Sequence, residues 1–247
     1  MFDLTGRTAL VTGASRGIGR TACLGFAAAG ADIVIHYNRQ RDAAISVAKD
    51  VMAMGRRADV VQADLADPDE IESMMTSVST IVGVAGLHIL LNNAGIYPTG
   101  TIETVDVAQW DHVMAVNARG PFLCTKYALP LLKQAQDARV INVGTILTHR
   151  GSTGMLDYIS SKAAVVGLTH ALVRELGPYG ITINCIIPSH VETEMSGPVD
   201  PPVLAEQAIQ RPQQPEDLLG LLIFLASRAS SFTTGQTILS DGGRILL

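Results

Sequence analysis

The sequence is poor in charged and aromatic residues and has no excess of basic ones. Only 17% of the 247 residues are charged and 4% are aromatic, with 18 lysines and arginines against 23 acidic residues. The 47% apolar content excludes a disordered protein, because disordered chains combine high charge with few apolar residues. The net charge of −5 argues against nucleic acid as the main partner, since a phosphate backbone requires a basic surface.

Long hydrophobic runs and paired cysteines are also missing. The longest apolar stretch, residues 81–91, contains His88 and falls well short of the roughly 18 residues that span a membrane. The opening residues, MFDLTGR, lack the pattern of a secretory signal. Cys23, Cys124 and Cys185 lie far apart with no CxxC pair, which predicts neither disulfides nor a metal site. We therefore expect a cytoplasmic protein that does not bind a membrane.

Short β-branched runs alternate with helical stretches along the whole chain. Most of these runs are continuously apolar, which is typical of strands buried on both faces of a sheet. The alternation predicts one α/β domain over residues 1–247, a doubly wound parallel sheet of seven strands with helices on both faces. We expect strands at residues 8–12, 32–36, 58–62, 87–91, 139–143, 181–187 and 237–240, and helices at 17–29, 42–54, 68–82, 107–136, 155–176 and 215–226.

One stretch, residues 189–214, is irregular and contains Pro198, Pro201, Pro202 and Pro212. Long connections inside a compact domain are more often functional than mere spacers. We expect a substrate lid at about 189–214.

A glycine-rich loop, TGASRGIG at 12–19, follows the first predicted strand and opens the first predicted helix. Glycines 13, 17 and 19 allow a tight turn and a close approach to a pyrophosphate, which the helix N-terminus would also attract. The alternative is a glycine-rich turn without a ligand. The position at the first crossover favours a dinucleotide.

A tyrosine and a lysine lie four residues apart in a predicted helix, at Tyr158 and Lys162. That spacing puts both on one helix face, so that the ammonium can approach the phenol. The alternative is an ordinary solvated pair.

With NNAG at 92–95 and Asn117, these motifs resemble the short-chain dehydrogenase/reductase family. The resemblance continues through Pro188 and Thr193 to DGG at 241–243, and thus covers the whole chain. The motifs are weak singly and specific in this order. They imply a Rossmann-type fold and an oxidoreductase that interconverts a ketone or aldehyde and an alcohol by hydride transfer.

The resemblance also implies the catalytic residues. Tyr158 would be the general acid/base, its phenolate stabilised by Lys162 and the oxidised nicotinamide. Lys162 would also bind the nicotinamide ribose, and Asn117 would hold a proton-relay water. Thr145 occupies the usual position of a serine; it keeps the hydroxyl that would hold the substrate oxygen and adds a methyl group. Ser189 replaces the more common glycine.

Whether the protein prefers NAD or NADP depends on the charge at the end of the second predicted strand. An acid there would bind the ribose of NAD, whereas a base would favour the 2′-phosphate of NADP. Here Tyr37, Asn38 and Arg39 occupy the position, with Arg16 in the loop, so we favour NADP(H) over NAD(H). Arg39 and Arg41 could also simply face solvent. The expected cofactor-binding residues are Gly13, Ser15, Arg16, Gly17, Ile18, Gly19, Tyr37, Asn38, Arg39, Asp64, Leu65, Asn93, Ala94, Gly95, Tyr158, Lys162, Pro188, Val191 and Thr193.

The substrate stays open. A 3-oxoacyl-[acyl-carrier-protein] would need a basic cluster near the site, and Arg119, Lys126, Lys133 and Arg174 are scattered. Small polar carbonyls or sugars are an equal alternative, because His149, Arg150 and His190 fall near the expected pocket, although each could be a surface residue.

A function of another class is a non-catalytic dinucleotide sensor or scaffold. Thr145 and Ser189 suggest it, and the intact Asn117, Tyr158 and Lys162 oppose it.

The predicted helices 107–136 and 155–176 carry apolar residues beyond one stripe, and the chain is weakly charged. The resemblance implies that these helices pair between subunits. We expect a homotetramer or homodimer.

Overall fold

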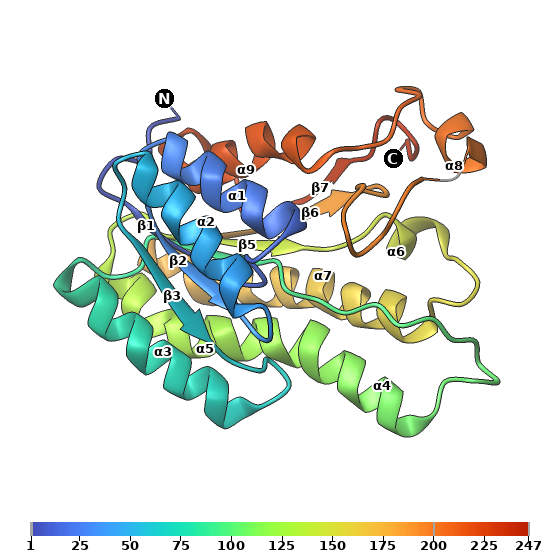
Figure 1. Cartoon of the computed structure of the whole chain (residues 1–247), viewed down its shortest axis with the longest axis horizontal. Helices are drawn as coiled ribbons and strands as arrows, with labels where there is room; N and C mark the ends of the chain where they lie inside the picture. The colour runs from blue at the N-terminus through green and yellow to red at the C-terminus, as the bar shows by residue number, and fades with distance from the viewer. Residues whose placement is uncertain (1, 200, 247) are drawn as a thin grey trace.

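Seven parallel strands form one sheet at the centre of the computed structural model, which describes residues 2–199 and 201–246 (Figure 1). The strand order is β3-β2-β1-β4-β5-β6-β7, and every pair is parallel. This confirms the predicted doubly wound α/β fold. The strands are β1 (Thr8–Val11), β2 (Asp32–Tyr37), β3 (Ala58–Gln62), β4 (Ile89–Asn92), β5 (Arg139–Val143), β6 (Thr182–Pro188) and β7 (Thr237–Ser240).

The central strands are apolar because both of their faces are covered. In β1, Ala9 and Val11 belong to one hydrophobic cluster, whereas Leu10 between them belongs to the cluster on the opposite face. Successive strand residues point to opposite faces, so a strand covered on both sides needs apolar residues throughout. The continuous runs in the sequence thus reflect two helical layers.

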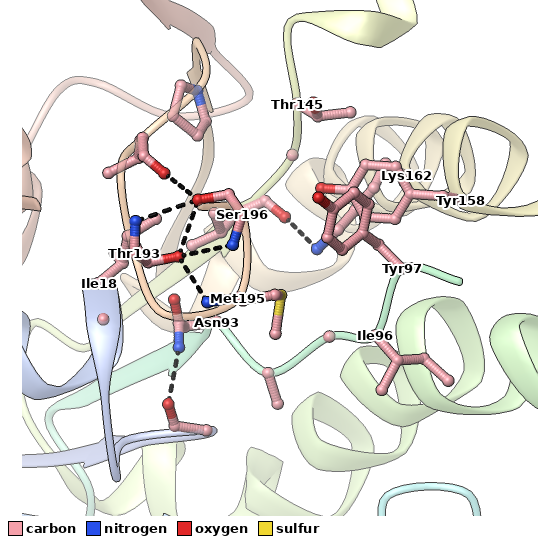
Figure 2. A pocket seen from close by; sticks show the side chains of 18 of the residues that line it. Ile18, Asn93, Ile96, Tyr97, Thr145, Tyr158, Lys162, Thr193, Met195 and Ser196 are labelled. Atoms are coloured by element: carbon pink, nitrogen blue, oxygen red, sulfur yellow. Dashed lines mark hydrogen bonds between the residues drawn. The ribbon is translucent and has the colours of Figure 1, made fainter. Parts of the chain in front are cut away.

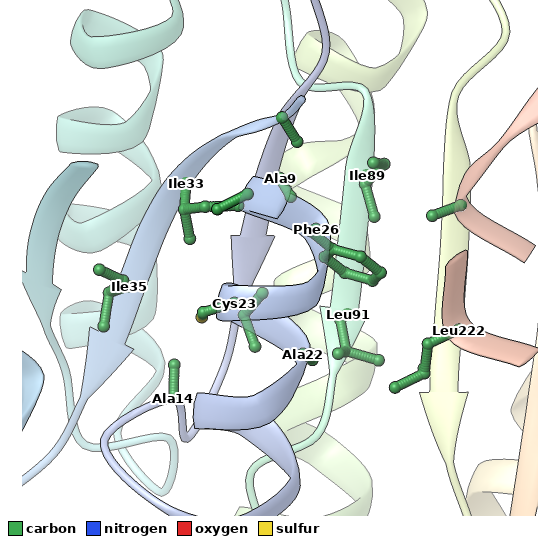
Figure 3. Packing of buried hydrophobic residues seen from close by; sticks show 14 of the residues in the cluster. Ala9, Ala14, Ala22, Cys23, Phe26, Ile33, Ile35, Ile89, Leu91 and Leu222 are labelled. Carbon is green, nitrogen blue, oxygen red and sulfur yellow. The ribbon is translucent and has the colours of Figure 1, made fainter. Parts of the chain in front are cut away.

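Helices cover both faces of the sheet (Figure 1). One layer comprises α1 (Gly17–Ala28), α2 (Arg41–Ala53) and α9 (Leu219–Ala226), and the other comprises α3 (Pro68–Val82), α5 (Gly120–Gln134) and α7 (Leu156–Leu176). Figure 3 shows Phe26 and Cys23 of α1 packed over Ile33 and Leu91 of the sheet. Phe26 is fully buried, and burial of such a side chain contributes about 1.5–3 kcal/mol.

The start of α3 follows from its local sequence. The Asp67 carboxylate accepts hydrogen bonds from the backbone N–H groups of Asp69 and Glu70 at 2.9 and 3.3 Å. Pro68 occupies the first turn, where a missing N–H costs nothing. The predicted helix at 68–82 is confirmed.

The predicted helix 107–136 is wrong as one regular helix. It consists of α4 (Val107–Met114), a π-helical segment (Ala115–Arg119) and α5. At the end of the π-helical segment the N–H of Gly120 donates to the carbonyl of Ala115, and Pro121 has no N–H for the carbonyl of Asn117. The wider turn leaves the apolar pattern nearly unchanged, so periodicity did not reveal it.

Other boundaries also differ from the prediction. The stretch 215–226 begins as a 3-10 turn (Pro215–Leu218) before α9, and two short helices, α6 (Leu147–Arg150) and α8 (Pro201–Ala205), were not predicted. Helices this short contain too few turns to produce an apolar period. Among the described residues no helix is both long and apolar enough to cross a membrane.

Candidate active site

A cavity of about 810 Å³ opens at the carboxyl ends of the strands. There β1 lies between β2 and β4, so the strand order reverses and the two connecting loops separate, which is where ligands bind in open α/β sheets. The predicted site residues that line this cavity are Gly13, Ser15, Arg16, Gly17, Ile18, Tyr37, Asn38, Arg39, Asp64, Leu65, Asn93, Ala94, Gly95, Thr145, Tyr158, Lys162, Pro188, Val191 and Thr193.

The glycine loop has no room for side chains at its turns. Gly13 has φ +62, and a Cβ on it would lie 2.8 Å from the Cα of Ala94. Gly17 has φ +52, and its Cβ would lie 3.2 Å from Thr193. The loop leads into α1, whose first turn carries neither an acidic residue nor a side-chain cap. The positive end of this helix is therefore available to an anion in the cavity.

Gly19 does not line the cavity. A Cβ at Gly19 would lie 2.4 Å from the Gly13 carbonyl oxygen and 2.6 Å from Nδ2 of Asn93. That amide nitrogen donates to the carbonyls of Thr12 and Gly13 at 2.9 and 3.1 Å. Gly19 thus permits the packing that fixes the loop.

His36 is a cavity residue that the sequence interpretation missed. Its Nδ1 accepts a hydrogen bond from the N–H of Gly13 at 3.0 Å, so Nε2 carries the proton and donates to the carbonyl of Ala63 at 3.0 Å. Burial lowers the pKa of His36 to about 4. The neutral ring connects the glycine loop to the end of β3. A histidine inside an otherwise apolar strand was the available signal.

The end of β2 carries the groups expected to discriminate between NADP and NAD. Tyr37, Asn38 and Arg39 all line the cavity, and none of them is acidic. Arg16 also lines it and lies 3.7 Å from Glu194, with both side chains partly exposed. This arrangement leaves the cavity at β2 without a carboxylate that would repel a 2′-phosphate.

Tyr158 and Lys162 lie together on one face of α7, as their spacing predicts (Figure 2). Lys162 Nζ lies 6.0 Å from the centre of the Tyr158 ring and donates to the carbonyl of Val143 at 2.8 Å. Burial raises the pKa of Tyr158 to about 12, and the neighbouring Thr145 hydroxyl acts in the opposite direction. Burial also lowers the pKa of Lys162 to about 8. The phenol is protonated at neutral pH, as it is at the ordinary tyrosine pKa of about 10, and can donate a proton.

Asn117 lies behind this site and does not line the cavity. It is fully buried in the π-helical segment. Its Oδ1 accepts from the N–H of Ile96 at 2.8 Å, while its Nδ2 donates to the Ile96 carbonyl at 2.8 Å and to the Ser161 hydroxyl at 3.1 Å. The side chain therefore ties the loop after β4 to α7.

Tyr97 is a second neighbour of Tyr158 that sequence interpretation missed. The two rings meet edge to face with centroids 5.5 Å apart, and Tyr97 also lines the cavity (Figure 2). The residue lies two positions after the NNAG motif, but the contact depends on how the loop after β4 approaches α7.

Segment 189–214 contributes another wall. Ser189 is buried, and its hydroxyl donates to Oε1 of Gln207 at 3.0 Å. The Gln207 amide donates in turn to the carbonyls of Ile209 and Arg211 at 3.1 and 3.0 Å. Ser189, where the resemblance leads one to expect glycine, thus anchors this segment.

The polar residues predicted for the substrate pocket line the cavity only in part. Arg150 and His190 line the cavity, as expected, whereas His149 is not among its lining residues. Nε2 of His190 is buried and has no hydrogen-bond partner in the described part of the chain. Glu206 and Arg244 also line the cavity and were not predicted.

Comparison with known proteins places the chain in a family. A family model described as short chain dehydrogenase matches residues 7–203. The 3-oxoacyl-[acyl-carrier-protein] reductase of Synechocystis is 35% identical over 248 residues, covering 100% of both chains. The protein belongs to the short-chain dehydrogenase/reductase family. Its sequence motifs thus predicted the family correctly, and the protein is an oxidoreductase of this class.

Solved short-chain dehydrogenase/reductase structures share its fold. One from Burkholderia cenocepacia, in complex with NADP, has a TM-score of 0.92 at 35% identity and covers 98% of both chains. A blue fluorescent protein from a metagenomic library, in complex with NADPH, has a TM-score of 0.93 at 33% identity, covering 99% of this chain and 100% of that one.

Proposed function

We propose that this short-chain dehydrogenase/reductase interconverts a ketone or aldehyde and an alcohol with NADP(H), Tyr158 acting as general acid/base. The observation that carries the proposal is one cavity lined both by the glycine loop and by Thr145, Tyr158 and Lys162. The solved relatives with NADP and NADPH support this cofactor.

The residues present fit a dinucleotide phosphate. The close approach of the loop at Gly13, the uncapped start of α1 and the lack of an acid at Tyr37–Arg39 accommodate its anionic groups. Arg16 and Arg39 would hold the 2′-phosphate. The remaining cofactor contacts are proposed for the cavity residues predicted from the sequence, with Gly19 supporting the loop. When bound, the cofactor supplies or accepts the hydride.

The chain's own groups supply the proton and orient the substrate. The Tyr158 phenol is protonated at neutral pH, as reduction of a carbonyl requires, and the Lys162 ammonium would stabilise the phenolate that follows. The Thr145 hydroxyl would hold the substrate oxygen beside the phenol. Asn117 would support a proton relay, because Pro121 leaves its carbonyl without the usual helical donor.

Replacement of Tyr158 by Phe tests the mechanism. We expect at least a 100-fold loss of carbonyl reduction, the scale of lost general acid catalysis, with NADPH binding retained. The measurement is reduced-nicotinamide absorbance over a carbonyl panel, with fluorescence titration of NADPH and NADH. Tyr127→Phe is the matched control on α5. Wild-type turnover by Tyr158→Phe would refute the mechanism, and tighter binding of NADH than NADPH would refute the cofactor.

Two alternatives are separated by the same panel. A 3-oxoacyl-[acyl-carrier-protein] reductase is favoured by the names of several similar proteins, including one from Staphylococcus aureus at 33% identity over 241 residues. It predicts preference for an acyl-carrier thioester. A non-catalytic sensor predicts cofactor binding without oxidation of NADPH by any carbonyl.

We further propose a cytoplasmic homodimer or homotetramer, with 189–214 as a substrate lid of a single domain. Buried free cysteines at positions 23, 124 and 185 suit a reducing compartment. The exposed apolar side chains of Phe122 on α5 and Tyr179 just after α7 suit contact between subunits, and the Ser189 anchor suits a segment that closes over the cavity.

A further inference from the structure

The cavity is lined by more positive charge than a cofactor and a catalytic lysine account for. Its cationic lining residues are Arg16, Arg39, Arg150, Lys162 and Arg244, and its carboxylates are Asp64 and Glu206. Arg16, Arg39 and Asp64 lie on the loops after β1, β2 and β3, where the cofactor is proposed. Arg150, Glu206 and Arg244 therefore form a separate charged group. Its two arginines, Arg150 and Arg244, are called the arginine pair here.

In this group two guanidinium groups share one carboxylate. Arg150 donates through Nη1 and Nη2 to the two Glu206 oxygens at 2.5 and 3.1 Å. Arg244 donates through Nε and Nη2 to Oε2 of Glu206 at 2.8 and 2.5 Å. With two cations and one anion, the group carries a net charge of +1 toward the cavity.

The burial of the three side chains is unequal. The Arg244 side chain is 5% exposed, whereas those of Arg150 and Glu206 are 32% and 46% exposed. A buried arginine is held in place and needs an anionic partner, whereas a half-exposed glutamate regains water contacts when another anion replaces it. Glu206 is thus the member of the group that a competing anion can displace.

The three residues come from different segments that meet only in the fold. Arg150 ends α6, Glu206 follows α8 and Arg244 lies after β7. Figure 1 shows α6, α8 and the C-terminal end of the chain at the same end of the molecule. Apolar side chains, among them Ile146, Leu147 and Val203, also line the cavity.

We propose that Arg150 and Arg244 bind an anionic group of the substrate, with Glu206 as its counter-ion in the free enzyme. The inference rests on the proposed carbonyl reduction and names its substrate class, a carbonyl compound with an apolar segment and a terminal anion. A planar guanidinium matches a carboxylate or phosphate oxygen pair. The carboxylate of an oxo acid and the phosphate of an acyl thioester both have this chemistry.

The experiment compares matched charged and neutral carbonyls. Methyl-ketone carboxylic acids of increasing chain length, their methyl esters and acetoacetyl-coenzyme A are reduced with NADPH by the wild type, Arg150→Met and Glu206→Gln. We expect Arg150→Met to lower kcat/KM for the anionic substrate about 10–100-fold, the scale of a charged hydrogen-bonded pair, chiefly through KM. The ester should change less than about 2-fold, within the spread of mutations that remove no contact.

Glu206→Gln separates substrate binding from a structural link. Removal of the counter-ion should raise kcat/KM for the anionic substrate about 3–10-fold, because the arginine pair no longer has to release Glu206. If the ion pairs only hold the structure together, both Arg150→Met and Glu206→Gln should lower kcat/KM for the acid and the ester alike. Added salt should raise KM for the acid and leave the ester unchanged.

Three results would overturn the inference. The first is a higher kcat/KM for the ester than for both its acid and the thioester, and the second is an equal effect of Arg150→Met on kcat/KM for all substrates. The third is a fall in kcat/KM for the anionic substrate with Glu206→Gln. In each case, Tyr158-dependent turnover of the ester would leave the proposed reduction intact. Preference for the free acid identifies the carboxylate as the bound group, and preference for the thioester identifies the phosphate.

Discussion

At the scale of single residues, the burial of Lys162 lowers the stability of the folded protein. Its side chain is 4% exposed, and burial lowers its pKa to about 8. An unfolded lysine keeps its proton to about pH 10.4, so between about pH 8 and 10.4 the unfolded chain binds more protons than the folded one. The free energy of unfolding therefore rises with pH through this window. Below it, the folded protein carries the full cost of a buried ammonium.

Lys162→Met should consequently make the protein more stable and inactive. At pH 7 we expect the free energy of unfolding to rise by about 1–3 kcal/mol, the scale of the cost that lowers the Lys162 pKa to about 8, less the hydrogen bond lost at the Val143 carbonyl. Thermal unfolding measures it, with the exposed Lys49→Met as control. The gain should shrink toward pH 10. A less stable variant at pH 7 would contradict this account.

At the scale of elements, segment 189–214 depends on side-chain anchors. Besides the Ser189 hydroxyl, the Gln213 amide connects the segment to the Ser240 carbonyl at 2.7 Å, and its oxygen accepts from the Ser189 N–H at 2.9 Å. The only regular helix among its described residues is α8 (Pro201–Ala205). Such a segment is held by a few buried hydrogen bonds and opens more readily than the sheet.

Ser189→Ala tests this anchoring. Loss of the hydroxyl leaves the Gln207 oxygen without its donor and should lower the free energy of unfolding by about 1–2 kcal/mol. Hydrogen exchange should become faster over 201–214 and stay unchanged in β4 and β5. Ser46→Ala, at an exposed position of α2, is the matched control. Equal exchange in the two variants would show that the Ser189 hydroxyl does not anchor segment 189–214.

For the whole molecule, the notable surface lies on α5 and α7. A hollow there is lined by the apolar side chains of Phe122, Leu129, Leu172 and Tyr179 and by the charged ones of Lys126, Lys133 and Glu175. Phe122 of α5 and Tyr179, in the 3-10 turn after α7, remain 42% and 51% exposed. Exposed large apolar side chains on neighbouring helices are typical of an interface. The low charge of the chain has a structural explanation if a second subunit covers this surface.

Phe122→Glu should weaken the proposed assembly, because it places a charge in an apolar contact. Light scattering at micromolar concentration should show a dimer or tetramer for the wild type and a shift to smaller species for the variant. Phe232→Glu is the control, since Phe232 is fully exposed elsewhere. A monomeric wild type would contradict the proposal.

Local chemistry explains what sequence interpretation found. Continuous apolar strands such as β4, the glycine loop at Gly13 and Gly17, and the Tyr158–Lys162 pair each depend on near neighbours in the chain. The missed features depend on distant ones. His36 accepts a hydrogen bond from Gly13, 23 residues earlier in the chain. Glu206 pairs with arginines from two other segments.

The sequence by itself determined the sheet, the family and the residues around Tyr158, because apolar periodicity, backbone freedom and helical spacing act over short distances. Only the tertiary structure decided that Asn117 and Gly19 support the site from behind the cavity, that burial raises the pKa of Tyr158, and that Arg150 and Arg244 share one acid. Desolvation and ion pairing between remote segments depend on which groups exclude water together, and that is a property of the packed chain.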